Sequence, residues 1–319
     1  MGRNFGPAGD AMDRLKLTPL ARTLIRVLVV VAIAATLAAT MRHITFNRVV
    51  EVLRSVDLIR LSVLVSLALT LGFLLRAARF RALLDSLNGR RAPLFDVLAS
   101  VVLSQGANNV LPLRAGELVR TRDFVAWGLP LRRVAVAQVI EKIVEVATLL
   151  GWVLIVMSRP VPALLVAGSV ASILGAWFFL APSHGRKALG LIGRIIRVES
   201  LLKALGWSVL ADGAEVALIA VCLGSLGIHA SLPMSVAVLA GVNLAIALPS
   251  TPGHLGVFEA GAAVGLLFAG VSGEVAVSFA LLYRIVQWVP VTLAAGILEL
   301  VRDPMRRAQR SVTLQEGKQ

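Results

Sequence analysis

The chain alternates between apolar runs of membrane-spanning length and short segments that carry most of its Lys and Arg residues. A helix needs about 20 predominantly apolar residues to cross the hydrocarbon core of a bilayer. The pattern therefore predicts an all-α polytopic membrane bundle with about six full spans, at residues 24–41, 61–75, 134–157, 161–180, 207–226 and 275–300. Residues 46–60 carry a charge about every third position, which indicates an amphipathic helix at the membrane interface.

Two further apolar runs are interrupted. The run at 93–112 ends at Pro112, and the run at 233–271 is broken in its middle by Pro252 and Gly253. Proline removes a backbone donor and clashes with the preceding turn, so a helix does not continue through it unchanged. Inside a membrane, the freed backbone groups are tolerated only where protein or a water-filled cavity satisfies them. We therefore expect two re-entrant hairpins of broken helices, an arrangement that transporters use to hold a polar ligand.

Charges at the flanks orient these hairpins. Basic residues lie on both sides of the first hairpin, so it enters from the cytoplasmic side and returns there. No Lys or Arg lies between Lys203 and Arg284, so the second hairpin opens from the outer face. Each break is followed by a glutamate, Glu117 or Glu259, and the first break is preceded by Asn109. An inverted repeat would produce this relation.

Composition supports a membrane location. Of the 319 residues, 57% are hydrophobic and 16% are charged, and the mean hydropathy of +0.84 is outside the range of soluble domains. The net charge of +14 fits retention of basic loops in the cytoplasm better than nucleic-acid binding. We expect a multi-pass protein of a bacterial inner (cytoplasmic) membrane with both termini in the cytoplasm. Its parts are then a leader at residues 1–23, one transmembrane domain at 24–301 and a basic tail at 302–319.

Several kinds of chemistry are excluded by the sequence. The single cysteine, Cys222, rules out an internal disulfide and a multi-cysteine metal site. The chain has neither the phosphate-cradling loop of a nucleotide enzyme nor a nucleophile elbow. We therefore expect no metal, no cofactor and no ATP hydrolysis.

Ionisable and polar residues inside the apolar segments are the candidate functional groups. Each ionisable one costs roughly 2.5–3.5 kcal/mol on insertion scales, so an unneeded one should be rare. Glu141 and Glu145 share one helix face, and so do Asp212 and Glu215. The candidate substrate-binding residues are Asn109, Arg114, Gly116, Glu117, Glu141, Lys142, Glu145, Asp212, Glu215, Pro252, Gly253, Glu259 and Arg284.

These residues allow two interpretations. In the first they are structural ion pairs, for example Glu141 or Asp212 with Arg284. In the second, the six acidic residues of the set exceed its three basic ones, so some carboxylates are protonated, solvated or matched by a cationic ligand. A central polar cavity would then hold a lipid headgroup, with its phosphate at the helix starts near Gly116 and Gly253. If Glu141 carries a proton in this cavity, Glu141→Gln should abolish transport and leave folding intact.

Five stretches resemble the lysylphosphatidylglycerol synthase transmembrane domain family, also called flippase-like membrane proteins. They occur in the family's order, at residues 75–84, 109–117, 139–145, 252–259 and 282–288. The resemblance implies an integral membrane domain that, in bifunctional members, moves aminoacylated phosphatidylglycerol across the bilayer. We expect a stand-alone member without the soluble aminoacyl-transferase domain, because only a short tail follows residue 301. Other stand-alone relatives look like partners of polyprenyl-linked glycan or glycolipid pathways.

Three features depart from the family pattern. Phe80 follows Arg79 where the family usually has tryptophan, and Lys142 and Glu145 stand where an arginine and an aspartate are usual. These two departures preserve the character of the family residues. The third is His254, which replaces a second glycine and places a bulky side chain in a turn that is expected to approach the ligand.

The sequence leaves three functions open. The favoured one is binding and translocation of a phospholipid or polyprenyl-phosphate-linked lipid by a protein without its own ATPase. One alternative is a membrane-embedded transferase that acts on a lipid-linked donor and uses carboxylates as general bases. Another is an accessory subunit of a glycosyltransferase or other lipid-modifying enzyme. A lipid with changed covalent structure would favour the transferase, whereas unchanged lipid in the opposite leaflet would favour the flippase.

Overall fold

The computed structural model describes helical parts of the chain from residue 54 onward. The described residues are 54, 56–88, 92–111, 116–156, 197–247 and 254–316, with side chains as far as residue 301. All of them belong to the compact unit His43–Gln319. The predicted leader, the predicted spans at 24–41 and 161–180, and most of the predicted interfacial helix at 46–60 lie outside the described residues.

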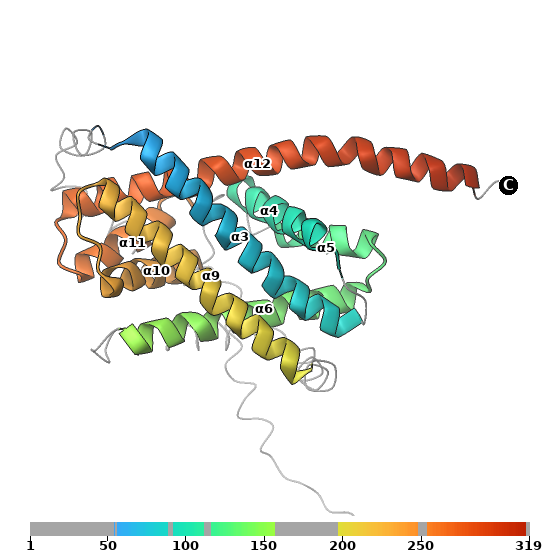
Figure 1. Ribbon diagram of the computed structural model, residues 1–319, viewed down its shortest axis with the longest axis horizontal. Helices are drawn as coiled ribbons and strands as arrows, with labels where there is room; N and C mark the ends of the chain where they lie inside the picture. The colour runs from blue at the N-terminus through green and yellow to red at the C-terminus, as the bar shows by residue number, and fades with distance from the viewer. Residues whose placement is uncertain are drawn as a thin grey trace, which may run out of the picture. The chain divides into compact units, whose positions relative to one another are not determined.

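Every regular element in the described residues is a helix, which confirms the predicted all-α class (Figure 1). In chain order these helices are α3 (Leu58–Asn88), α4 (Leu94–Val110), α5 (Gly116–Ala126), α6 (Leu131–Val156), α9 (Val198–Ser225), α10 (Leu232–Ala247), α11 (Val257–Phe268) and α12 (Gly273–Glu316). α3 and α9 pack side by side, and α6 packs against both.

Three of these helices are long and apolar enough to cross a membrane. They are Leu58–Leu87 in α3, Val198–Ser225 in α9 and Gly273–Val301 in α12, and they correspond to the predicted spans at 61–75, 207–226 and 275–300. Large apolar side chains remain exposed on these helices, including Ile59 and Leu67 on α3 and Leu293 and Ile297 on α12. Such faces suit contact with lipid tails, which are as apolar as leucine itself.

The predicted span at 134–157 corresponds to α6, which has 26 residues. It is long enough to cross, but it is not among the helices that are apolar enough, because Glu141, Lys142 and Glu145 lie in its central part. Length and hydropathy therefore do not place α6 in the membrane by themselves. Tertiary contacts with its charged side chains decide how this helix is accommodated.

α12 continues beyond the predicted end of the last span at residue 300 and runs to Glu316. Its 44 residues correspond to about 66 Å of helix, roughly twice the hydrocarbon thickness of a bilayer. The predicted basic tail therefore begins as a continuation of the last helix.

Both predicted helix interruptions are present. α4 ends at Val110, Leu111 has extended backbone angles, and a new helix starts at Gly116. α10 ends at Ala247, and α11 starts after Gly256, whose φ is +81°. The two members of each pair, α4 with α5 and α10 with α11, pack against each other. Each interrupted run therefore forms a pair of packed half-helices, as predicted.

Small residues let α10 and α11 approach until their backbones touch. A Cβ atom placed on Gly261 would lie 2.5 Å from the carbonyl oxygen of Gly241, and one on Gly265 would lie 2.6 Å from that of Ala237. Gly261 and Gly265 are four residues apart and so face the same way. This is the small-residue packing that membrane helices use, because it maximises van der Waals contact where no hydrophobic effect operates.

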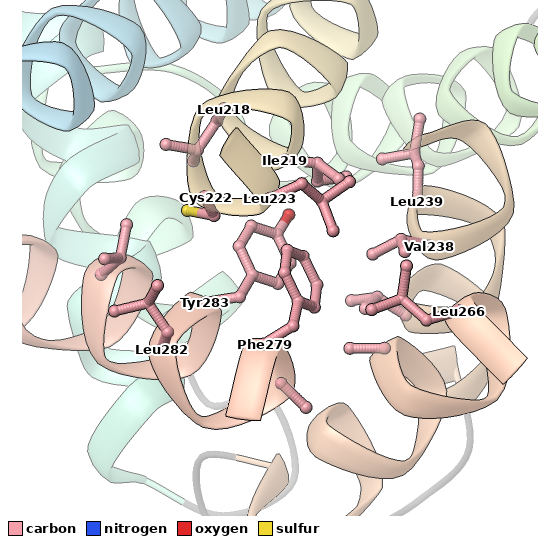
Figure 2. Close-up of a cluster of buried hydrophobic side chains, with 14 of the residues drawn as sticks. Leu218, Ile219, Cys222, Leu223, Val238, Leu239, Leu266, Phe279, Leu282 and Tyr283 are labelled. Atoms are coloured by element: carbon pink, nitrogen blue, oxygen red, sulfur yellow. The ribbon is translucent and has the colours of Figure 1, made fainter. Parts of the chain in front are cut away.

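Two apolar clusters fill the bundle. Figure 2 shows part of the first, which α9, α10, α11 and α12 form together with the start of α3 and the end of α6. The rings of Phe279 and Tyr283 stack in its centre with centroids 5.4 Å apart, and Ile219, Leu223 and Leu266 lie around them.

The second apolar cluster lies between α3, α4, α5 and α6, and it also includes one residue each from α9 and α12. Phe80 of α3 and Phe124 of α5 pack with ring centroids 5.6 Å apart, and Val97 and Ile140 are buried in the same cluster. Since α6 and α9 contribute to both clusters, residues midway along these helices lie at the junction of the two.

Gly261→Ala should force α10 and α11 apart, because the new methyl group would lie 2.5 Å from the Gly241 oxygen and 2.7 Å from Cβ of Ala245. Overpacking of this kind costs roughly 1–3 kcal/mol. We expect a lower thermal unfolding midpoint for this variant in detergent solution. Gly296→Ala on α12 is the matched control, since its methyl group meets open space and should leave the midpoint unchanged or slightly higher. Equal midpoints for the two variants would contradict the close helix approach.

Candidate functional site

The centre of the site is Glu141 of α6, whose carboxylate lies between two buried arginines. Its Oε1 accepts a hydrogen bond from Nη2 of Arg79 at 2.9 Å, and its Oε2 accepts one from Nη1 of Arg120 at 2.7 Å. None of the three residues is more than 4% exposed. The Arg120 guanidinium also lies 4.5 Å from the ring centroid of Phe80, a cation–π geometry. One carboxylate therefore joins α3, α5 and α6.

Arg79 binds a second glutamate and a serine. Its Nη2 also donates to Glu145, which lies one turn after Glu141 on the same face of α6. Its Nη1 donates to the hydroxyl of Ser208 on α9 at 3.1 Å, and that hydroxyl lies 3.0 Å from the hydroxyl of Thr148. Arg79 therefore ties α3 to both α6 and α9.

Three charged side chains continue the site toward the surface, and we call them the rim. Oε2 of Glu117 accepts from Nη2 of Arg120 at 2.5 Å. Nζ of Lys142 donates to Oε2 of Glu145 at 2.7 Å and lies 3.9 Å from Oε1 of Glu117. The side chains of Glu117, Lys142 and Glu145 are 27%, 44% and 32% exposed. The site is thus buried at Glu141 and open to the surroundings at its rim.

Glu215 of α9 extends the site toward α12. Its Oε2 accepts from Nη2 of Arg76 at 2.7 Å, and its Oε1 accepts from the Tyr283 hydroxyl and from Nε2 of Gln287. Arg76 lies one turn before Arg79 on α3. We refer to the ion-paired residues described so far, including the adjacent Arg76–Glu215 pair, as the charge network: Arg76, Arg79, Arg120, Lys142, Glu117, Glu141, Glu145 and Glu215.

The charge network lies at the junction of the two apolar clusters. Along α6, Val144 belongs to the second cluster and Leu149 to the first. Along α9, Ala204 belongs to the second cluster and Val216 to the first. The polar side chains therefore form a layer between two dry cores, where low polarity strengthens each ion pair and makes each unpaired charge costly.

The second broken helix reaches this layer through an aromatic contact. Oε1 of Glu259 lies 3.7 Å from Nε of Arg284 on α12, and the Arg284 guanidinium lies 5.3 Å from the ring centroid of Phe258. Phe258 also packs against Tyr283, with ring centroids 5.4 Å apart. Oε2 of Glu259 accepts from the backbone N–H of Gly256 at 2.7 Å and so caps α11. Both broken helices thus contact the site, α5 with its own charges and α11 through Phe258.

The model of the lysylphosphatidylglycerol synthase TM region family matches residues 24–295, which is most of the chain. The chain belongs to this family. It is therefore a membrane protein related to lipid-modifying and flippase-like functions. A comparison with curated proteins gives no significant match. The family assignment confirms the resemblance that the sequence motifs indicate.

In this family member, the structure brings together seven of the 13 predicted site residues. Those in or beside the charge network are Glu117, Glu141, Lys142, Glu145, Asp212 and Glu215, with Gly116 directly before Glu117. Glu259 and Arg284 form the second ion pair. Arg114, Pro252 and Gly253 lie outside the described residues, so their predicted roles remain predictions.

The predicted residues at the first helix break have structural partners. Nδ2 of Asn109 donates to the hydroxyl of Thr292 at 2.9 Å, which cross-links α4 to α12. The backbone N–H of Gly116 donates to Oδ1 of Asn108 at 2.8 Å. The N–H group that was expected to face a phosphate at this helix start is therefore already bonded.

Sequence reasoning missed three arginines of the charge network. Arg76 and Arg79 directly follow an apolar run, and Arg120 lies among other basic residues, so all three resemble cytoplasmic loop charges. With them included, four cations face four glutamates, and the expected excess of carboxylates is largely removed. The pairing of Glu141 with Arg284, one example of a structural ion pair, does not form, because Glu141 instead accepts hydrogen bonds from Arg79 and Arg120. One feature of the sequence does indicate a role for Arg120: it lies three residues after Glu117, a spacing that allows an ion pair on one helix.

The predicted proton carrier, Glu141, has no free oxygen. Each oxygen accepts from a guanidinium group, so the carboxylate serves as the shared partner of two arginines. Glutamine at this position would point an amide donor at Arg79 or Arg120. We therefore expect Glu141→Gln to impair folding, contrary to the expectation from sequence.

The backbone at His254 has the conformation that glycine adopts most easily. His254 has φ of +56°, in the left-handed region that residues with a Cβ atom adopt at a cost and glycine adopts freely. The turn before α11 thus keeps the glycine conformation although the side chain has changed.

Arg79→Gln should destabilise the protein by roughly 3–5 kcal/mol, because it removes one of the two guanidinium partners of the buried Glu141 and leaves Glu145 with Lys142 alone. Arg81→Gln is the matched control on the same helix. Its partner, Asp85, is 3.6 Å away and both side chains are about 30% exposed, so we expect an effect of roughly 1 kcal/mol or less. Thermal and denaturant unfolding in detergent measure both variants. Similar losses would contradict the central role of the Arg79–Glu141 pair.

Proposed function

We propose that the protein binds and translocates a phosphate-bearing lipid, either a phospholipid or a polyprenyl-phosphate-linked lipid. The charge network would hold the headgroup while the hydrocarbon chains stay in the bilayer. Membership of a family related to lipid-modifying and flippase-like functions supports this proposal. The proposed setting is a bacterial inner membrane, with both termini in the cytoplasm and the transmembrane domain at residues 24–301.

The observation that carries the proposal is an unused donor on each of the two central arginines. Nε of Arg79 and Nε of Arg120 are buried and have no hydrogen-bond partner among the described residues. A guanidinium group carries five N–H donors and bonds phosphate oxygens in a bidentate manner. Because both arginines flank the same carboxylate, a phosphate that reached this point would accept hydrogen bonds from both.

The rim suits the first contact with a headgroup. Lys142 is the most exposed cation of the charge network and lies beside Glu117 and Glu145. A lysine attracts phosphate as a point charge, and a neighbouring carboxylate binds an amine if the headgroup carries one. Rim and centre together would lead an anionic headgroup from the surface toward Arg120 and Arg79.

Movement of the headgroup would require exchange of partners within the network. A phosphate bound to Arg79 competes with Glu141 and Glu145 for the same donors. These carboxylates neutralise the arginine when no lipid is bound and replace the phosphate when it leaves, so the charge is never left unpaired in an apolar region. No step requires ATP hydrolysis. An enzyme that makes or consumes the lipid, such as a glycosyltransferase, would be a natural partner.

Lys142→Gln should slow lipid translocation roughly tenfold, the effect of losing one charge-assisted hydrogen bond at a partly exposed site. The fold should survive, because Glu145 keeps its contact with Arg79. The assay follows fluorescent phospholipid and polyprenyl-phosphate probes across proteoliposome membranes. Lys203→Gln is the matched control, since Lys203 forms a similar ion pair with Glu199 at 2.5 Å but is well exposed at the start of α9. We expect wild-type rates for it.

Two results would contradict the proposal. One is wild-type protein that moves no probe faster than protein-free vesicles, which would point to an accessory role. The other is a probe whose mass changes during the assay, which would point to a transferase. Native mass spectrometry of lipid that co-purifies with the protein identifies the headgroup class independently.

A further inference from the structure

We propose that Asp212 of α9 is a proton-binding site and that its protonation promotes binding of an anionic lipid headgroup to the charge network. The effect on lipid binding rests on the proposed function, whereas the proton-binding site does not depend on it. Asp212 lies one turn after Ser208 and three residues before Glu215, so all three share the face of α9 that meets α3 and α6.

Charge balance singles out Asp212. The four cations of the charge network face four glutamates, and each glutamate lies within ion-pair distance of at least one of these cations. Within the described residues Asp212 forms no ion pair, although Arg76 and Arg79 act on it from farther away. An ionised Asp212 therefore leaves the site with one uncompensated negative charge, and a proton on Asp212 removes it.

One oxygen of Asp212 has nothing to bind. Oδ2 is buried and without a hydrogen-bond partner among the described residues, and so is Nε1 of Trp152 on α6. Trp152 packs against Gly213, the residue that follows Asp212 on α9. Its Cζ2 atom lies 3.7 Å from the point where a Cβ atom on Gly213 would be. An indole N–H only donates, and a carboxylate only accepts. One water molecule bound between them would satisfy both atoms and supply a proton directly to Oδ2.

A chain of hydroxyl groups leads from Arg79 to the carboxyl group of Asp212. Nη1 of Arg79 donates to Ser208, whose own proton is then free to go to Thr148 at 3.0 Å. The Thr148 hydroxyl also lies near enough to the Asp212 carboxyl group to interact with it, and it donates to the backbone oxygen of Glu145 at 3.1 Å. Thr148 can therefore donate to Asp212 when Asp212 is ionised and turn to the Glu145 oxygen when Asp212 is protonated. This gives the carboxyl group a defined partner in both states.

The charged groups around Asp212 determine whether its protonation strengthens or weakens phosphate binding. The charged and titratable groups that face Asp212 are Glu145 on α6 and Arg76 and Arg79 on α3, with Glu215 on α9 itself and Tyr283 on α12 bound to Glu215. A proton taken from water converts the carboxylate to a neutral acid, and the arginines are then less compensated. A phosphate should bind more tightly in this state, and release of the proton should favour release of the lipid.

Infrared spectroscopy of the wild-type protein and Asp212→Asn tests the proton site directly. As the pH is lowered, the carboxylic-acid C=O signal of wild type should contain one component that is missing from the signal of Asp212→Asn. Glu199→Gln, at the exposed start of the same helix, is the matched control and should keep this component. Identical C=O signals in wild type and Asp212→Asn at every pH would show that Asp212 takes up no proton and would overturn the inference.

The coupling is measured by binding of a phospholipid probe at a series of pH values. We expect wild type to bind on the order of tenfold more tightly at low pH than at high pH, within the usual range of coupling between sites. Asp212→Asn, which is neutral at every pH, should bind as tightly as protonated wild type and show no such dependence. Wild-type binding without pH dependence would overturn the coupling and leave the proposed function standing, whereas absence of binding at every pH would refute the proposed function itself.

Discussion

The structure depends on a single carboxylate held between two guanidinium groups. Glu141 is only 2% exposed, and its two oxygens bind arginines that come from different helices, Arg79 on α3 and Arg120 on α5. Removal of three charges from water is costly, and only close, fully bonded geometry offsets the cost. The same interaction that makes α6 acceptable inside an apolar bundle therefore fixes where α3 and α5 must lie.

This constraint explains the layered interior. Apolar side chains cannot satisfy the charges, so they separate into one cluster on each side of the charge network. The two broken helices then reach the layer from different directions, α5 with Glu117 and Arg120 and α11 through Phe258. Groups that stabilise the bundle and groups suited to a headgroup are consequently the same, and any exchange of ion partners during transport also perturbs the fold.

The near balance of positive and negative charges makes the net charge of the site sensitive to a single proton. Four cations and four glutamates cancel, and both central arginines keep an N–H donor that has no partner among the described residues. In such a site a single additional carboxylate, Asp212, determines whether the net charge is zero or negative. A change of one proton is then large in relation to the net charge of the site, although it is small in relation to the number of ionised groups.

The sequence by itself determined the helical membrane class, three of the described spans and both helix interruptions, because length, hydropathy and proline act locally along the chain. It also located the acidic residues, since an ionisable group in an apolar run is conspicuous wherever the chain folds. Only the tertiary structure decided their partners. Arg76 and Arg79 could equally have faced the cytoplasm, and it is the packing of α3 against α6 and α9 that turns them inward, toward glutamates more than 60 residues away in the chain. Sequence could count the charges in the spans, but which of them are neutralised depends on distances that exist only after the helices have packed.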